Sequence, residues 1–233
     1  MQNIGFPFEF EDSYGHGKRL KFIIKAIKNY CQEYEKEKEQ IKILDIGCGT
    51  GIGLTFPIAS LGYKIVGVDT DKYSIDWANK ENIYPNVSFE CGFLENLTYL
   101  SGFDIIICSE VLEHIPDPKN FLLLLKSRLN FKGIIILTIP NGYGWFEFEK
   151  FIYEKLRPLI KPRIKLKIII APHKPLPLAT LNKKDIHLQW FSYRGIKKLI
   201  KEIDFSILQE GKAGLFGGLF QKLFYFGLNF GKN

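Results

Sequence analysis

From Lys42 to Leu54 the chain reads KILDIGCGTGIGL, and the rest of the architecture can be worked out from this stretch. Its first part, Ile43-Leu44-Asp45-Ile46, is a short apolar run of the kind that forms a buried parallel strand. Glycines follow at positions 47, 49, 51 and 53. Glycine permits positive φ and lets a ligand come close to the backbone. A strand, a glycine-rich turn and a helix in this order are typical of a site that holds a nucleotide at the carboxyl ends of the strands.

A second apolar run, Lys64-Ile65-Val66-Gly67-Val68, ends in Asp69 at about the spacing expected of a ribose-binding acid. A carboxylate at this place can accept hydrogen bonds from two adjacent ribose hydroxyls, and its charge disfavours a 2′-phosphate. The simpler alternative is a set of turn glycines and an Asp that caps a helix. Strand, glycines, helix, strand and acid in the expected order favour the nucleotide site.

The segment DIGCGTG resembles the D-x-G-x-G-x-G loop of class I S-adenosylmethionine-dependent methyltransferases. The leading acid distinguishes this pattern from the dinucleotide fingerprint G-x-G-x-x-G, which fails here because Ile52 and Leu54 stand where its third glycine belongs. The resemblance covers residues 40–140 well and 185–210 more loosely. It implies a cofactor with its methionyl end near the glycine loop and its ribose on Asp69. The implied cofactor-binding residues are Asp45, Gly47, Cys48, Gly49, Gly51, Asp69, Thr70, Gly92, Phe93, Ser109 and Glu110.

One departure from the resemblance concerns adenine. Many relatives have Gly-Asp after the third strand, where the Asp reaches the adenine amino group, whereas this chain has Gly92-Phe93. Phe93 could stack beside the adenine, and the hydrogen bond would come from Glu95 or from the backbone. The departure affects how adenine is recognised and leaves the site itself in place.

The segment SEVLEHIP, Ser109 to Pro116, is where acceptor chemistry is expected. Residues three and four apart share a helical face, so Glu110, Glu113 and His114 could converge on Mg²⁺, Mn²⁺ or Zn²⁺. The segment resembles the E-x-x-E-H of the ubiquinone-pathway O-methyltransferases (the methyltransferase type 11/23 group) and of small-RNA 2′-O-methyltransferases. The RNA enzymes add a later histidine, which His187 matches loosely, so the predicted metal ligands are Glu110, Glu113, His114 and His187.

The same segment can work without a metal. A histidine near its free pKa can take a proton from a hydroxyl at neutral pH, so His114 or His187 is then the general base. His114, His187 and Glu113 are therefore the predicted catalytic residues. In related methyltransferases that bind no metal, the histidine packs or hydrogen-bonds locally, and this alternative stays open.

The pattern of apolar runs predicts a Rossmann-like, doubly wound α/β fold with a mostly parallel sheet, in one domain over residues 1–233. We expect helices at 18–39, 73–82, 120–129 and 193–203, the last capped by Ser192. The expected strands are 43–46, 64–69, 87–91, 103–109, 134–139 and 204–208. A seventh strand is not evident, and the Phe-rich tail, 211–233, is interpreted as a core-covering or membrane-interfacial helix. Residues 1–40 form an N-terminal helix and lid, and 143–184 a basic, hydrophobic insertion that covers the substrate.

Charge and cysteine usage constrain partners and compartment. The net charge is +7 over 233 residues, yet residues 155–198 alone carry twelve Lys or Arg and one acid. This concentration favours an anionic partner. The four cysteines form no C-x-x-C pair, no secretory signal begins the sequence and no apolar run is long enough to span a bilayer. We expect a cytoplasmic protein, with peripheral contact at a membrane surface as an option.

These observations give one leading function and three alternatives. The leading one is S-adenosylmethionine-dependent methylation, on oxygen, of a hydrophobic small molecule, a lipid-linked compound or a glycan. RNA 2′-O-methylation is the second, favoured by the basic segment and E-x-x-E-H but lacking an RNA-binding module. A non-catalytic cofactor-binding protein and an NAD-dependent enzyme are further alternatives. The oligomeric state does not follow from the sequence.

Overall fold

The computed structural model describes residues 16–140, 188–189, 191–214 and 222–229, which include a seven-stranded sheet. The strand order is β3-β2-β1-β4-β5-β7-β6, and β7 runs antiparallel to the other strands of this sheet. The chain order therefore reverses direction between β1 and β4, where ligands bind in open α/β sheets. The strands are β1 (Lys42–Ile46), β2 (Lys64–Asp69), β3 (Val87–Cys91), β4 (Phe103–Ser109), β5 (Leu129–Pro140), β6 (Ser206–Gly214) and β7 (Lys222–Asn229).

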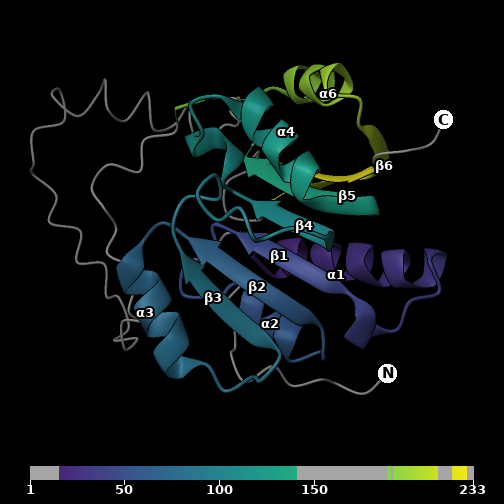
Figure 1. Cartoon of the computed structure of the whole chain (residues 1–233). Helices are drawn as coiled ribbons and strands as arrows, with labels where there is room; N and C mark the ends of the chain where they lie inside the picture. The colour runs from purple at the N-terminus through teal and green to yellow at the C-terminus, as the bar shows by residue number, and fades with distance from the viewer. Residues whose placement is uncertain (1–15, 141–187, 190, 215–221, 230–233) are drawn as a thin grey trace, which may run out of the picture.

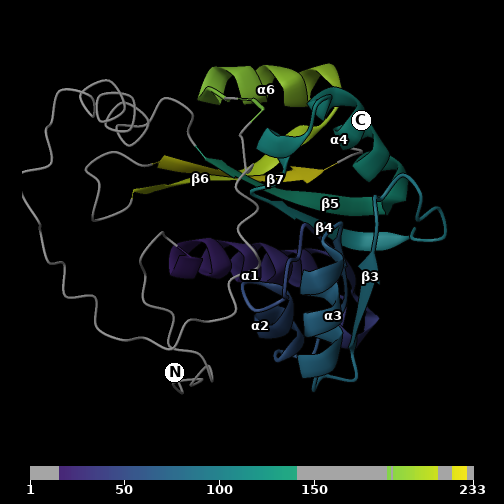
Figure 2. The same cartoon turned by 90° about the vertical axis from the view of Figure 1, so that its left-hand side faces the viewer.

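Helices cover both faces of the sheet, as Figures 1 and 2 show. The helices α1 (His16–Glu33), α2 (Thr55–Ala59) and α3 (Lys72–Glu81) lie on one face. The opposite face carries α4 (Pro118–Arg128) and α6 (Tyr193–Glu202). Two short 3-10 helices, η1 (Lys38–Gln40) and η2 (Leu112–His114), precede β1 and follow β4.

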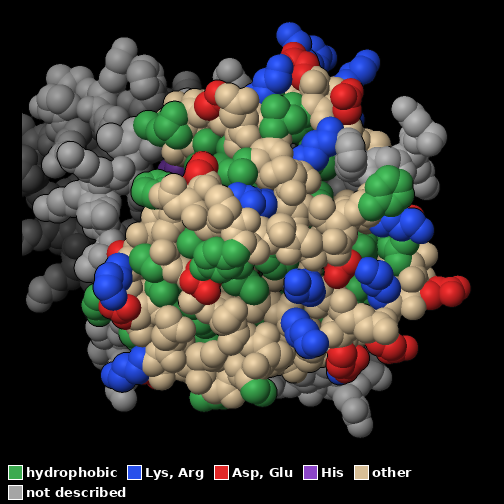
Figure 3. Space-filling model, viewed as in Figure 1, with side chains coloured by type: hydrophobic (Ala, Val, Ile, Leu, Met, Phe, Trp, Pro, Cys, Tyr) green, Lys and Arg blue, Asp and Glu red, His purple; other side chains and the backbone are tan. Residues whose placement is uncertain are grey.

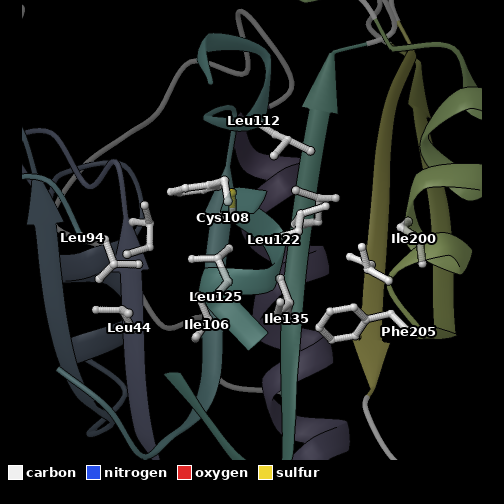
Figure 4. Packing of buried hydrophobic residues seen from close by; sticks show 14 of the residues in the cluster. Leu44, Leu94, Ile106, Cys108, Leu112, Leu122, Leu125, Ile135, Ile200 and Phe205 are labelled. Carbon is white, nitrogen blue, oxygen red and sulfur yellow. The ribbon is translucent and has the colours of Figure 1, made fainter. Parts of the chain in front are cut away.

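The core follows from the alternation of side chains along the strands. Figure 4 shows Leu44, Ile106 and Ile135 packed with α4 and α6 on one face. Their sequence neighbours Ile43 and Ile105 point to the other face and pack with α1. Both faces of β1 and β4 are therefore buried, which explains their uninterrupted apolar runs. Burying one such aliphatic side chain contributes about 1.5–3 kcal/mol, so the centre of the sheet is the rigid platform for the residues at its edge.

The predicted fold class is confirmed, and so are the five parallel strands from β1 to β5. Ser192 caps α6 by accepting a hydrogen bond from the backbone N–H of Gly195, as predicted. The first helix is shorter than the expected 18–39 because it ends at Glu33, two residues before Glu35 adopts positive φ. The charged stretch beyond it has no apolar face to bury, so the α-helix does not continue, and only the short 3-10 helix η1 follows.

The helix expected in the tail is wrong over Lys222–Asn229, which forms β7. The apolar residues of this stretch fit a helical face, but an apolar run on both sides of a strand also suits the interior of a sheet. Here β7 fills the slot between β5 and β6 and pairs with both. It is the antiparallel strand that the sequence did not reveal.

Several predicted segments fall outside the described residues. The insertion 143–184 lies outside them, and so do residues 1–15 of the N-terminal lid and parts of the tail. Figure 3 shows basic and acidic side chains mixed around the rim of the described surface in that view. Within the described part of the chain, no helix is long and apolar enough to cross a membrane.

Candidate functional site

The glycine loop sits at the carboxyl end of β1. Gly47 has a φ of +70°, and an added Cβ would overlap Cγ2 of Val111. Its backbone N–H and that of Cys48 both donate to the carbonyl of Val68, at 2.8 and 3.1 Å. The loop is therefore fastened to the end of β2. A side chain at position 47 would meet both backbone strain and a steric barrier, so glycine is required there.

Asp69 closes the loop from the neighbouring strand. Its Oδ2 accepts from the backbone N–H of Gly49 at 2.7 Å, and its Oδ1 accepts from that of Asp71 at 2.8 Å. These two bonds fix the plane of the carboxylate, while each oxygen retains a further lone pair. The predicted binding of ribose hydroxyls by this carboxylate stays a prediction.

A cavity of 390 Å³ opens beside this carboxylate, at the carboxyl ends of β1 to β4. Volumes of this size are typical of small-molecule sites. Gly92 and Phe93 line the side next to Asp69, and Phe93 leaves 63% of its surface exposed. The exposed Phe93 side chain offers a surface on which an aromatic ring of a ligand can stack. The predicted residues that line the cavity are Gly47, Asp69, Thr70, Gly92, Phe93, Glu110 and His114; Glu95 lines it too.

Other predicted residues lie behind the cavity wall. Asp45 is 1% exposed, and its Oδ2 accepts from Oγ1 of Thr55 at 2.6 Å. Burial raises the pKa of Asp45 to about 7. Asp45 therefore braces the start of α2 beneath the loop. Burial also raises the pKa of the Cys48 thiol, which keeps it protonated. Gly49 and Gly51 shape the loop, and Oγ of Ser109 lies 2.9 Å from Oγ1 of Thr138.

The E-x-x-E-H segment does not form the single helical turn that the sequence predicted. Glu110 has a φ of 57°, so it lies outside a right-handed helix, and η2 begins only at Leu112. Glu110 and Glu113 therefore do not share a helical face. Oε1 of Glu110 instead accepts from Oγ1 of Thr138 at 3.0 Å, which ties it to β5.

Glu113 is a buried acid next to His114. The residue is 2% exposed, its Oε1 lies 3.9 Å from Nε2 of His114, and its Oε2 has no hydrogen-bond partner among the described residues. Burial and, secondly, the charge of Glu110 raise the pKa of Glu113 to about 8. Glu113 is thus a carboxylic acid at neutral pH. His114 faces the cavity with 35% of its side chain exposed.

Arg19 is a site residue that the sequence reasoning missed. It comes from α1, and a guanidinium nitrogen lies 4.0 Å from Oε1 of Glu110, with the Arg19 side chain 13% exposed. Its charge opposes the rise in pKa of Asp45, Glu110 and Glu113. The only signal in the sequence was a basic residue directly before the buried Leu20, and such residues usually point to solvent.

Of the predicted metal ligands, the structure describes Glu110, Glu113 and His114. The described residues contain no group of three His, Cys, Asp or Glu side chains arranged to hold a metal ion. His187 lies outside the described residues. Glu110 and Glu113 do not share a helical face, and the guanidinium of Arg19 lies 4.0 Å from the carboxylate of Glu110. The geometry therefore does not support the predicted ligand set of Glu110, Glu113 and His114.

Solved structures resemble this fold at low sequence identity. Magnesium protoporphyrin IX methyltransferase from Synechocystis PCC 6803 with bound SAH aligns with a TM-score of 0.62 at 15% identity, covering 96% of this chain and 88% of that one. A SAM-dependent methyltransferase from Methanosarcina mazei aligns with a TM-score of 0.59 at 19% identity, covering 87% and 95%. These similarities concern the fold.

Sequence comparison gives the family. A ubiquinone biosynthesis O-methyltransferase from Rickettsia bellii is 32% identical over 127 residues, which are 53% of this chain and 50% of that protein. The Pasteurella multocida protein of the same name is 33% identical over 114 residues, 43% and 46% of the two chains. This chain thus matches about half the length of these relatives. The profile of the family described as "Methyltransferase domain" matches residues 16–210. With the glycine loop, Asp69 and the strand order, this match shows that the chain belongs to the class I S-adenosylmethionine-dependent methyltransferases.

Proposed function

We propose that this protein transfers a methyl group from S-adenosylmethionine to a hydroxyl of an apolar acceptor. One observation carries the proposal: a single cavity is lined by the Gly47 backbone, the oriented Asp69 carboxylate and the His114 imidazole. The residues expected to bind the cofactor and a group that can accept a proton thus line the same cavity. The name of the curated relatives supports oxygen as the acceptor atom.

The residues present fit the cofactor. The absence of a side chain at Gly47 leaves backbone for close approach, and Asp69 would hold the ribose. Phe93 would lie against the adenine. Arg19 adds a positive charge beside Glu110, which would favour the carboxylate of the methionyl end. The bound cofactor supplies an activated methyl group on a sulfonium.

The chain itself supplies alignment and a base. His114 accepts the proton of the acceptor hydroxyl as the oxygen becomes the nucleophile. Oε1 of Glu113 lies 3.9 Å from Nε2 of His114, so the two groups interact electrostatically when the imidazole carries the proton. Apolar side chains that line the cavity exclude water and suit an apolar acceptor. They are Ile46, Val68, Leu94, Val111, Ile115 and Phe121.

The acceptor is proposed at the level of chemical class. A quinone precursor, a lipid-linked compound or a glycan each offers a hydroxyl, and the curated relatives are named for ubiquinone biosynthesis. The basic residues between 155 and 198 would favour peripheral contact with an anionic membrane surface, in a cytoplasmic protein.

A labelled-methyl screen tests the proposal. Protein and methyl-labelled S-adenosylmethionine are incubated with lipid, quinone, glycan and RNA extracts. We expect label in an apolar extract, and the His114→Gln variant should lower kcat by roughly 10²–10⁴-fold while the Kd for S-adenosylhomocysteine stays the same. Absence of transfer to every extract, with S-adenosylhomocysteine still bound, would favour the non-catalytic alternative.

The same screen tests the metal and RNA predictions. The set that includes His187 stays a prediction: loss of transfer with a chelator and recovery with Mg²⁺ would support it, whereas unchanged transfer would reject it. RNA methylation is favoured by the +11 charge of residues 155–198. If RNA is the acceptor, label appears in the RNA extract and binding weakens steeply with salt.

A further inference from the structure

Two residues that precede α6, Leu188 and Gln189, are fastened to the loop that carries His114. The backbone N–H groups of Leu188 and Gln189 both donate to the carbonyl of Glu113, at 2.9 and 3.1 Å. The side-chain amide of Gln189 donates to the carbonyls of Ile115 and Pro116, at 3.3 and 2.8 Å. Four hydrogen bonds therefore connect positions that are more than 70 residues apart in sequence.

These bonds serve the carbonyls at the end of η2. A short helix leaves its last carbonyls without partners inside the helix. Here the carbonyl of Glu113, inside η2, accepts from the backbone N–H groups of Leu188 and Gln189. The carbonyls of Ile115 and Pro116, just beyond η2, accept from the side-chain amide of Gln189. The backbone N–H of His114 donates in turn to Val111 at 2.9 Å. The main chain on either side of His114 is thus fixed, while its imidazole faces the cavity.

The bond to Pro116 lies at the exposed surface. Water can replace a donor at such a place, so the amide adds little to stability. Water cannot replace the amide as a link between segments. The Gln189 side chain bonds the carbonyls of Ile115 and Pro116 at once and so fixes both relative to the segment before α6. The Gln189 amide therefore fixes the position of the loop while it contributes little to stability, as expected of a positioning residue.

We infer that Gln189 is a positioning residue for the methyl-transfer reaction: its amide sets the loop from Glu113 to Pro116 so that the imidazole of His114 meets the acceptor hydroxyl. This inference rests on the proposed function. It adds a residue that touches neither the cavity nor the expected cofactor site. A shift of about 1 Å in a reacting group can cost up to about 100-fold in rate, so the constraint has a measurable consequence.

The test removes the donors and keeps the shape. Gln189→Met has the same length without N–H groups, and Gln189→Glu turns oxygen toward the two carbonyls. The control is Gln209→Met, because Gln209 also uses its amide, accepting from Asn29 at 3.3 Å, but on β6. We expect Gln189→Met to lower kcat by roughly tenfold and Gln189→Glu by more, with KM changed less than kcat and the Kd for S-adenosylhomocysteine unchanged. Gln209→Met should match the unmodified protein.

A second measurement does not depend on transfer. The histidine ring signals are followed by NMR in ¹³C-labelled protein, and the signal of His114 is identified by its loss in His114→Gln. In Gln189→Met this signal should move and broaden, while it stays in place in Gln209→Met. An unmoved signal, or a kcat within twofold of the unmodified protein, would overturn the role of Gln189. Failure of the proposed function is distinguishable, because the unmodified protein would then transfer no label while the His114 signal still responds to Gln189.

Discussion

The two halves of the cavity are built in different ways. On the side of β1 and β2, the glycine loop and Asp69 are joined by backbone hydrogen bonds within about 25 residues of sequence, and both carboxylate oxygens of Asp69 are oriented by N–H groups. On the side of β4 and β5, Glu113 is buried with one carboxylate oxygen unpartnered among the described residues. On the same side, Arg19 of α1 and Thr138 of β5 contact Glu110, and the segment before α6 bonds to the carbonyl of Glu113.

This difference suggests that the half at β1 and β2 binds the cofactor and the half at β4 and β5 carries out the chemistry. A half whose polar groups are all satisfied is rigid and suits a cofactor that must be held in one pose. Burial raises the pKa of an acid in both halves, at Asp45 and at Glu113, but Glu113 lies beside a histidine that lines the cavity, an arrangement typical of acid–base sites. Changes in the first half should therefore affect cofactor affinity or folding, and changes in the second should affect rate or pH dependence. The following predictions test this division, beginning with the largest effect.

Asp69→Ala should weaken binding of S-adenosylhomocysteine by several hundredfold. The change removes both ribose acceptors, and hydrogen bonds to a charged group contribute about 1.5–3 kcal/mol each. It also frees the N–H of Gly49 and loosens the loop. Isothermal titration calorimetry measures the effect, with Asp76→Ala as control, because Asp76 is exposed and pairs only at the surface with Lys72. Equal affinities in the two variants would refute the placement of the ribose.

Gly47→Ala and Gly53→Ala should change stability in opposite directions. At Gly47 the positive φ and the overlap with Val111 both oppose a side chain, so we expect a loss of about 2–3 kcal/mol in the free energy of unfolding. At Gly53 an added Cβ meets nothing within 4 Å and φ is not positive, so alanine should stabilise by about 0.5 kcal/mol.

Urea denaturation of both variants gives these free energies. The double variant Gly47→Ala/Val111→Ala separates the two costs, because it removes the overlap and leaves the backbone strain. It should therefore recover part of the loss. No recovery would mean that strain alone makes glycine necessary at position 47.

The first half was predictable from sequence because its contacts are local. Asp45, Gly47 and Asp69 all fall where strand, turn and acid spacing place them, and the five parallel strands follow from apolar runs. The insertion 143–184 and His187 lie outside the described residues, so their roles stay predictions.

The second half was less predictable because its contacts are distant. The spacing of E-x-x-E-H suggests a helix, but Glu110 turns out of it to bond Thr138 on β5. Arg19 approaches from a helix 91 positions earlier, and Gln189 from a segment 74 and 73 positions later than its acceptors. No local pattern reports such contacts. Similarly, the apolar run of β7 could be told from a helix only once the gap between β5 and β6 in the sheet was known.

Glu113→Gln should reduce the pH dependence of stability, which is the effect specific to the second half. Burial raises the pKa of Glu113 from 4.5 to about 8, so the folded state favours the protonated acid. The stability from this group is complete below about pH 4.5 and is lost as pH rises toward 8, because ionisation then favours unfolding. Glutamine is neutral throughout. We expect the unmodified protein to lose about 3 kcal/mol more than Glu113→Gln between pH 5 and 8, since the raised pKa of Glu113 already includes the opposing charge of Arg19. Urea denaturation across this pH range measures the difference in stability. The control is Glu81→Gln, which changes an exposed acid on α3 and should keep the full pH dependence of the unmodified protein.

The contradicting outcome is equally clear. If Glu113→Gln loses as much stability as the unmodified protein, the buried carboxyl is ionised already at pH 5, and the proposed proton-exchanging role of this half of the cavity is wrong.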